Sequence, residues 1–205
     1  MIAVFALSFI GLLCISAPIT VALGGSAMAY ALISGNVPIT TLIQTTFGGL
    51  ATFPLLAIPL FMLAGNLMNE GGITPDLVRF ARTLLGHIKG GLGLATILAC
   101  AIFSAISGAA VATAVAIGVV MIPAMKAAGY DEDMGAAITC VASCMGPIIP
   151  PSIPFIIYGV AANVSVGALF LGGVFPGLLL GLTLMVYMYY VARKRNYPKG
   201  DVIPL

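Results

Sequence analysis

The sequence predicts an all-α membrane protein, and three observations support this class. The chain has 205 residues, of which 61% are hydrophobic and only 7% are charged, whereas soluble domains carry about 25% charged residues. The charges are segregated, because none occurs in residues 1–69, 90–125 or 134–192. Each gap is long enough for one or two crossings of about 20 residues. Prolines and glycines inside the gaps then divide the apolar sequence into helices, hairpins and breaks.

Composition also excludes some functions. The basic residues form no stripe on a soluble face, so we expect a lipid bilayer and no nucleic acid as partner. The cysteines lie in apolar runs without a neighbouring histidine and are expected to be packing residues, not metal ligands. They are Cys14, Cys100, Cys140 and Cys144.

Residues 1–69 are predicted to form two scaffold transmembrane helices. Residues 1–34 are too long for one straight crossing at about 1.5 Å per residue, so we expect a tilted or kinked crossing that bends at Pro18. The segment 35–38 is typical of a turn. Residues 40–49 are more polar and suit the membrane interface, and residues 53–68 form the second crossing.

Residues 70–89 are predicted to form an amphipathic arm helix on the membrane surface. Thr74 is expected to be its N-cap, followed by Pro75 at the first helical position. Apolar residues recur at helical spacing, at Leu77, Phe80, Ala81, Leu84, Leu85 and Ile88. The alternative is an ordinary solvated connector.

Residues 90–162 are predicted to be half of a transport domain. Residues 90–128 contain no charged loop and one internal terminator, Ser107-Gly108. Two full crossings remain an alternative, but the short limbs and uncharged tip favour a re-entrant hairpin whose tip stops inside the membrane. Residues 132–162 are predicted to be a broken helix, because four prolines lie in the eight residues 147–154 and cannot form a continuous helix. Ser152 is the expected cap of the second half.

Residues 163–205 are predicted to be the last transmembrane helix and a basic tail. Gly173, Gly177 and Gly181, spaced by four, form a smooth stripe suited to close packing. The basic residues fall on one side in this topology, which the positive-inside rule makes cytoplasmic together with the C-terminal tail. They are Arg79, Arg82, Lys89, Lys126 and those of the segment 193–199.

The two helix breaks are the predicted site of chemistry. Broken helices in a membrane offer carbonyl oxygens that suit a cation and amide hydrogens that suit a carboxylate. Hydroxyls gather at the breaks, at Ser104, Ser107, Thr113, Ser143 and Ser152. Alternatively, these hydroxyls bond to their own backbone. No charged side chain lies in the crossings, which favours Na⁺ over H⁺ coupling. No nucleophile, base and orienting acid occur together, so we expect no enzyme.

Five stretches of the chain resemble the large membrane subunit of tripartite ATP-independent periplasmic (TRAP) transporters, the DctM-like family. They are residues 53–68, 85–91, 106–108, 121–126 and 146–154. The resemblance implies an elevator-type, Na⁺-driven importer of organic acids, such as C4-dicarboxylates or sialic acid, in the bacterial inner membrane. It also implies two partners, a small membrane subunit and a periplasmic substrate-binding protein. The chain resembles only the first of the family's two inverted repeats, so a second repeat is a further expected partner.

The resemblance also implies which residues form the site. The coupling ion is expected at Ser104, Ser107, Gly108, Gly146, Pro147 and Pro150, and the substrate at Ala109, Ala110, Thr113, Pro151 and Ser152. Ala109 and Thr113 depart from the family, which often has Ser and Asp at these positions. The alternative function is a truncated or split membrane scaffold with no transport activity of its own.

Overall fold

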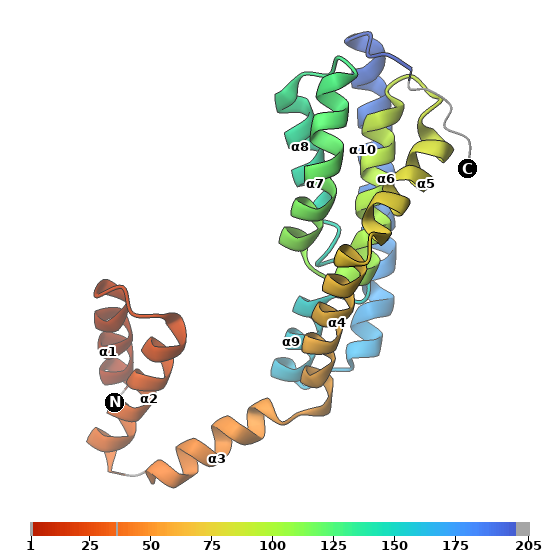
Figure 1. Ribbon diagram of the computed structural model, residues 1–205. Helices are drawn as coiled ribbons and strands as arrows, with labels where there is room; N and C mark the ends of the chain where they lie inside the picture. Colours follow the sequence, from red (N-terminus) through yellow and green to blue (C-terminus); the bar gives the residue numbers. More distant parts are fainter. Residues whose placement is uncertain (1, 36, 200–205) are drawn as a thin grey trace. The chain divides into compact units, whose positions relative to one another are not determined.

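The computed structural model describes residues 2–35 and 37–199 (Figure 1). Over these residues it contains ten helices and no strand apart from one isolated bridge. The helices are α1 (Ile2–Cys14), α2 (Ile19–Ser34), α3 (Ile39–Leu50), α4 (Phe53–Glu70), α5 (Ile73–Leu85), α6 (Gly91–Ser107), α7 (Ala110–Ala127), α8 (Glu132–Ser143), α9 (Ile153–Ala162) and α10 (Val166–Lys194). Of these, α4, α7 and α10 are long and apolar enough to cross a membrane. The all-α class with several candidate membrane spans is therefore confirmed.

The chain divides into two compact units after Thr52, and each is described by itself. In the first unit, α1 and α2 pack side by side as a helical hairpin. This differs from the single kinked crossing expected over residues 1–34. Ser16 adopts a left-handed conformation with φ 59°, and the Ala17 amide bonds to the Leu12 carbonyl oxygen at 3.1 Å. These features end α1 and reverse the chain before Pro18.

The rest of the first unit also contains more helix than expected. α3 forms where the sequence predicted only an interfacial segment. In the turn expected at residues 35–38, Gly35 ends α2 with φ 63°, while residue 36 lies outside the described residues. No residue of this unit is charged.

The second unit begins with α4, and the start of α5 corrects one prediction. α5 begins at Ile73 after Gly72, whose φ of 78° is left-handed, so Thr74 is not the N-cap. The Thr74 hydroxyl instead donates to the Asn69 side-chain oxygen at 3.1 Å. The left-handed glycine turns the chain one residue earlier than the Thr-Pro signal suggested, which leaves the hydroxyl free to tie α5 to the end of α4.

α5 is amphipathic, but it packs against the hairpin. Its buried face contains Thr74, Val78 and Ala81 and lies along α6. Phe80 and Leu84, also in the predicted apolar stripe, remain nearly half exposed. The packing therefore uses only part of the stripe and leaves an apolar edge free for lipid.

α6 and α7 form a helical hairpin, with its tip at residues 107–109. Gly108 ends α6 in a left-handed conformation with φ 63°, and its amide bonds to the Ser104 carbonyl oxygen. Most of α6 is buried, whereas α7 exposes Val111, Val115 and Val119. The hairpin thus has one limb inside the unit and one limb at its surface.

α8 and α9 form the predicted broken helix. α8 ends at Ser143, and α9 begins after Ser152, whose side-chain oxygen accepts a hydrogen bond from the Phe155 amide at 3.3 Å. The prediction of Ser152 as cap of the second half is confirmed.

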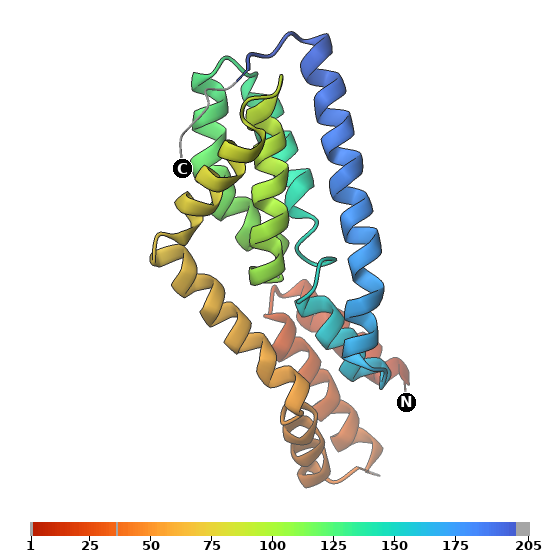
Figure 2. The ribbon, with the colours of Figure 1, turned by 90° about the vertical axis from the view of Figure 1, so that its right-hand side faces the viewer.

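α10 packs along α6 and α9, as Figure 2 shows. Its glycine stripe packs against the break between α8 and α9. A Cβ at Gly173 would stand 2.5 Å from the Ile148 carbonyl oxygen, and one at Gly177 would stand 2.6 Å from the Ile149 side chain. At Gly181 the nearest atom would be a methionine sulfur, at 3.2 Å. The predicted packing role is confirmed, and the partner is the irregular segment.

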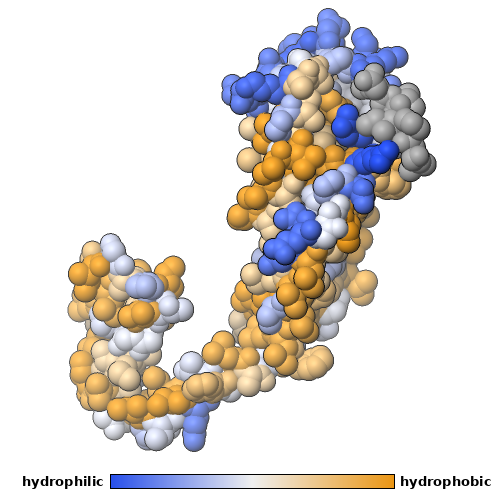
Figure 3. Space-filling view, viewed as in Figure 1, coloured by the Kyte–Doolittle hydropathy of each residue, from blue (hydrophilic) through white to orange (hydrophobic). Residues whose placement is uncertain are grey.

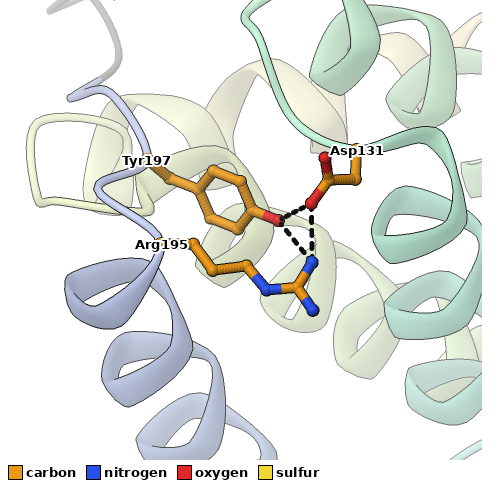
Figure 4. A network of polar contacts seen from close by, with 3 residues as sticks. All are labelled: Asp131, Arg195 and Tyr197. Carbon is orange, nitrogen blue, oxygen red and sulfur yellow. Dashed lines mark hydrogen bonds and ion pairs between the residues drawn. The ribbon is translucent and has the colours of Figure 1, made fainter.

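Hydrophilic side chains gather at one end of the second unit, where α7 joins α8 and α10 ends (Figure 3). There Asp131 accepts hydrogen bonds from Arg195 at 2.6 Å and from the Tyr197 hydroxyl at 2.7 Å (Figure 4). The bond from Tyr197, followed by that from Arg195, lowers the pKa of the Asp131 carboxyl. The Tyr197 ring also stacks on Tyr130, with centroids 4.3 Å apart. These contacts fasten the segment after α10 to the turn before α8.

Candidate functional site

The two predicted breaks come together in the structure. The Ile153 amide donates to the Gly108 carbonyl oxygen at 3.4 Å, which joins the hairpin tip to the start of α9. On the other side, a Cβ at Gly146 would stand 2.7 Å from the Ala109 carbonyl carbon. In Figure 2 the hairpin tip lies beside the connection between α8 and α9. Two segments far apart in the sequence therefore form one backbone junction.

Glycine is required on both sides of this junction. At Gly108, φ is 63° and an added Cβ would lie 2.5 Å from the Pro151 carbonyl oxygen. At Gly146 the atoms that would be met also belong to the backbone, so no side chain can move aside to make room. The tip and the break approach each other more closely than any residue with a side chain allows.

Three hydroxyls form a buried cluster just behind the tip. Thr113 Oγ1 lies 3.0 Å from Ser107 Oγ and 3.4 Å from Ser104 Oγ. It also donates to the Ala109 carbonyl oxygen at 2.9 Å. All three side chains are buried. The cluster joins both limbs of the hairpin and concentrates oxygen atoms where α6 ends and α7 begins.

The two serines of the broken helix are used differently. Ser143 Oγ donates to the Thr139 carbonyl oxygen at 2.6 Å, so it bonds back to its own helix, as the alternative interpretation predicted. Ser152 Oγ donates to the Pro147 carbonyl oxygen at 2.6 Å and accepts a hydrogen bond from the Phe155 amide. Ser152 therefore closes the break across five residues in addition to capping α9.

The predicted ion and substrate residues are not separated in space. Thr113, assigned to the substrate, lies among the hydroxyls assigned to the ion. Pro151, also assigned to the substrate, lies against Gly108, which was assigned to the ion. Among the described residues, no three His, Cys, Asp or Glu side chains come together. The oxygen atoms available to a hard cation at this junction are therefore carbonyls and hydroxyls.

The break is rich in such carbonyls. Four of the residues 146–154 are prolines, which have carbonyl oxygens but no amide hydrogens. The backbone there consequently has more acceptors than donors. At the hairpin tip, the first amides of α7, beginning at Ala110, lack carbonyl partners within the helix and suit an anion.

A cavity of about 330 Å³ opens between α4 and the hairpin tip. Its wall is mostly apolar and includes Ser107 and Ala109 from the tip together with Asn66 and Asn69 from α4. The two asparagines were not among the predicted site residues. Their signal was present, since Asn66 is the one hydrogen-bonding side chain in residues 53–68 and Asn69 directly follows this segment.

The junction lies between the two ends of α10. At the start of α6, Gly90 contacts Ala192 near the C-terminal end of α10. The break contacts α10 much nearer its N-terminal end, at Gly173 and Gly177. α9 continues along α10 beyond the break. The hairpin tip, which touches the break, therefore stops part-way along α10, the longest helix among the described residues.

An apolar helical chain in which a hairpin tip meets a broken helix has the construction of a multi-span membrane permease. Comparison with known families agrees with this class. The model of the family described as "Tripartite ATP-independent periplasmic transporter, DctM component" matches residues 6–202. The chain belongs to this family of TRAP transporter large permeases, which are transporters and not enzymes.

Curated relatives include permeases for different acids. The chain is 45% identical over 190 residues to the isethionate TRAP transporter permease protein DctMQ of Oleidesulfovibrio alaskensis. The aligned region covers 93% of this chain and 30% of that relative. It is 42% identical to the C4-dicarboxylate large permease protein DctM of Vibrio cholerae, over 95% of this chain and 43% of the relative. It is also 42% identical to the sialic acid large permease protein SiaM of the same organism, over 92% of this chain and 44% of that relative. The chain thus spans less than half the length of these relatives.

Proposed function

We propose that this chain is the first repeat of the large permease subunit of a Na⁺-driven TRAP transporter that imports organic acids. The observation that carries the proposal is the junction of hairpin tip and broken helix, where Gly108 and Gly146 bring two backbones into contact. Such paired discontinuous helices are typical of substrate and ion sites in secondary transporters.

The level of the junction supports a re-entrant hairpin. α10 is 29 residues long, or about 43 Å at 1.5 Å per residue, which is enough to cross a bilayer with some tilt. A tip that stops part-way along α10 then lies inside the membrane, as one repeat of an elevator-type transporter requires.

The oxygen-rich side of the junction suits Na⁺. Hydroxyl ligands come from the cluster of Ser104, Ser107 and Thr113, and carbonyl ligands from Gly108 and from Gly146, Pro147 and Pro150 in the break. Residues 1–69, 90–125 and 134–192 contain no Asp, Glu, Lys or Arg that could move a proton inside the membrane, which favours Na⁺ as the coupling ion. Because the hydroxyls already bond to one another, ion binding would replace these bonds with bonds to the ion.

The substrate carboxylate suits the amide hydrogens at the same junction. The Ala110 amide, at the start of α7, has no carbonyl partner within the helix. The Ala109 amide donates to Ser107 Oγ at 3.5 Å and would exchange this bond for one to the carboxylate. Pro151 and Ser152 belong to the adjoining break. Organic acids are the shared chemistry in the names of the three relatives: isethionate, C4-dicarboxylate and sialic acid. The proposed partners are a small TRAP membrane subunit, a periplasmic substrate-binding protein and a second repeat. The basic end of the second unit and the C-terminal tail face the cytoplasm of a bacterial inner membrane.

Uptake by reconstituted vesicles tests the proposal. The permease carrying this repeat, with its second repeat and small subunit, is reconstituted and supplied with the binding protein and a labelled organic acid. We expect uptake that requires a Na⁺ gradient and falls at least tenfold in Thr113→Val. Uptake that is unchanged when K⁺ replaces Na⁺ would refute Na⁺ coupling.

A scaffold without transport activity is the second candidate function, favoured by the mutual hydrogen bonds of the buried hydroxyls. It predicts that Ser107→Ala and Ser152→Ala leave the response of the melting temperature to Na⁺ and substrate unchanged. If the chain is part of a transporter, both variants should reduce the response of the melting temperature to Na⁺ and substrate.

A further inference from the structure

A second cavity, of about 340 Å³, lies at the hydrophilic end of the second unit, away from the junction. It is bordered by His87, Ile88 and Lys89 from the turn between α5 and α6, by Tyr189 and Arg193 near the end of α10, and by Lys199 from the tail. Four of these six side chains are basic, and none is acidic. The cavity therefore gathers positive charge from three separate segments.

Backbone contacts hold these segments together. Lys89 and Lys199 face each other in an antiparallel bridge, and the neighbouring Gly90 amide donates to the Pro198 carbonyl oxygen at 3.3 Å. The Arg193 guanidinium lies over the Tyr189 ring, 4.8 Å from its centroid. The fold thus places like charges side by side on fixed backbone.

These cations have no carboxylate partner in the part of the chain that the structure describes. The two ion pairs found there use Lys126 and Arg195, with Glu132 and Asp131. Like charges placed opposite each other across a backbone bridge are destabilising. An anion bound between Lys89, Arg193 and Lys199 would remove this repulsion.

The surface below the cavity indicates which anion fits. Along α10, an apolar ridge continues from the face of Tyr189 and Arg193 at spacings of three and four residues, and each member of the ridge is more than half exposed. Its members are Val186, Leu182, Leu178, Phe175 and Leu171. A free inorganic anion would leave this ridge unused, whereas a phospholipid has acyl chains to lie along it.

We infer that this cavity is a binding site for the headgroup of an anionic phospholipid. Arg193 and the two lysines bind the phosphate, Arg193 through paired N–H donors and the lysines as point charges. Tyr189 lies at the boundary between headgroup and hydrocarbon, where tyrosine is favoured. The acyl chains run along the ridge of α10.

Native mass spectrometry of the permease carrying this repeat tests the site. The protein is purified in neutral detergent and titrated with phosphatidylglycerol, with phosphatidylcholine and with inorganic phosphate. We expect phosphatidylglycerol to be retained at least tenfold more tightly than phosphatidylcholine. Arg193→Gln and Lys89→Gln should each weaken its binding about fivefold, since each basic residue near an anionic lipid surface contributes about a fivefold change in affinity.

Lys194→Gln is the matched control, because it removes the same charge from the end of α10 at a residue that does not border the cavity. It should change phosphatidylglycerol binding less than twofold. Equal effects of Lys194→Gln and Arg193→Gln would overturn the site in favour of general surface attraction. Binding of inorganic phosphate as tight as that of phosphatidylglycerol would overturn the lipid as ligand. Melting temperatures without lipid verify that each variant is folded.

Discussion

Replacing Gly108 with alanine tests the junction between the hairpin tip and the broken helix. The substitution has two separate penalties. The left-handed backbone at Gly108, with φ 63°, costs an L-residue about 1–2 kcal/mol. The added Cβ would also stand 2.5 Å from the Pro151 carbonyl oxygen, and overpacking of this kind costs about 1–3 kcal/mol. We expect a total loss of about 2–5 kcal/mol in the free energy of unfolding.

Two other glycines separate these penalties. Gly129 has φ 87° and nothing within 4 Å of an added Cβ, so Gly129→Ala should be destabilised by backbone strain but not by a close contact. Gly146 has no left-handed backbone, but an added Cβ would stand 2.7 Å from the Ala109 backbone. Gly146→Ala should therefore be destabilised by the close contact but not by backbone strain. We expect losses of about 1–2 kcal/mol and about 1–3 kcal/mol, which sum to the effect of Gly108→Ala.

The assay is equilibrium unfolding in detergent micelles, followed by circular dichroism. The same variants are then examined for Na⁺-dependent stabilisation, which should be lost in Gly108→Ala and Gly146→Ala and kept in Gly129→Ala. If all three substitutions destabilise equally, the tip and the break are not in contact, and the reasoning fails.

Three further predictions concern other parts of the second unit. Thr113→Val should lower the free energy of unfolding by about 1–3 kcal/mol in denaturant titrations, since it leaves the buried Ser104 hydroxyl without the hydrogen bond that it makes to Thr113. Thr113→Ser should restore most of the loss, and a neutral valine variant would contradict the cluster. Gly177→Leu should destabilise the protein by about 1–3 kcal/mol or more, because the new side chain would enter the break between α8 and α9. Gly172→Leu is the control, since nothing lies within 4 Å of an added Cβ at this position. Equal melting temperatures of the two variants would contradict the packing of α10 against the break. Asp131→Asn should alter the pH dependence of stability. The pKa of Asp131 is lowered in the folded protein, so its stabilising effect is present above the unfolded pKa of about 3.9 and is lost as the pH falls toward the folded pKa. The difference in stability between wild type and Asp131→Asn should therefore shrink below about pH 4, and a constant difference would contradict the network.

Patterns local to the chain determined much of this protein. The absence of charges over long gaps predicted apolar helices in a membrane. Ser107-Gly108 predicted the hairpin tip, because glycine reverses a helix in a left-handed conformation. The proline run predicted the broken helix and Ser152 as its cap, because proline removes the donors that a continuous helix needs. Each of these features depends on backbone chemistry within a few residues, and sequence shows such features directly.

Tertiary structure alone decided what these local features contact. The family resemblance implied that the two breaks share one site, but no local pattern placed the Gly108 carbonyl oxygen beside the Ile153 amide, since that contact depends on how the hairpin packs against the broken helix. The same holds for Asn66 on the wall of the cavity and for Lys89 opposite Lys199. The reversal at Ser16 was also missed, because a proline allows either a kink or a turn, and packing between α1 and α2 selected the turn. The sequence thus determined where the helices break, and long-range packing determined that the two breaks meet.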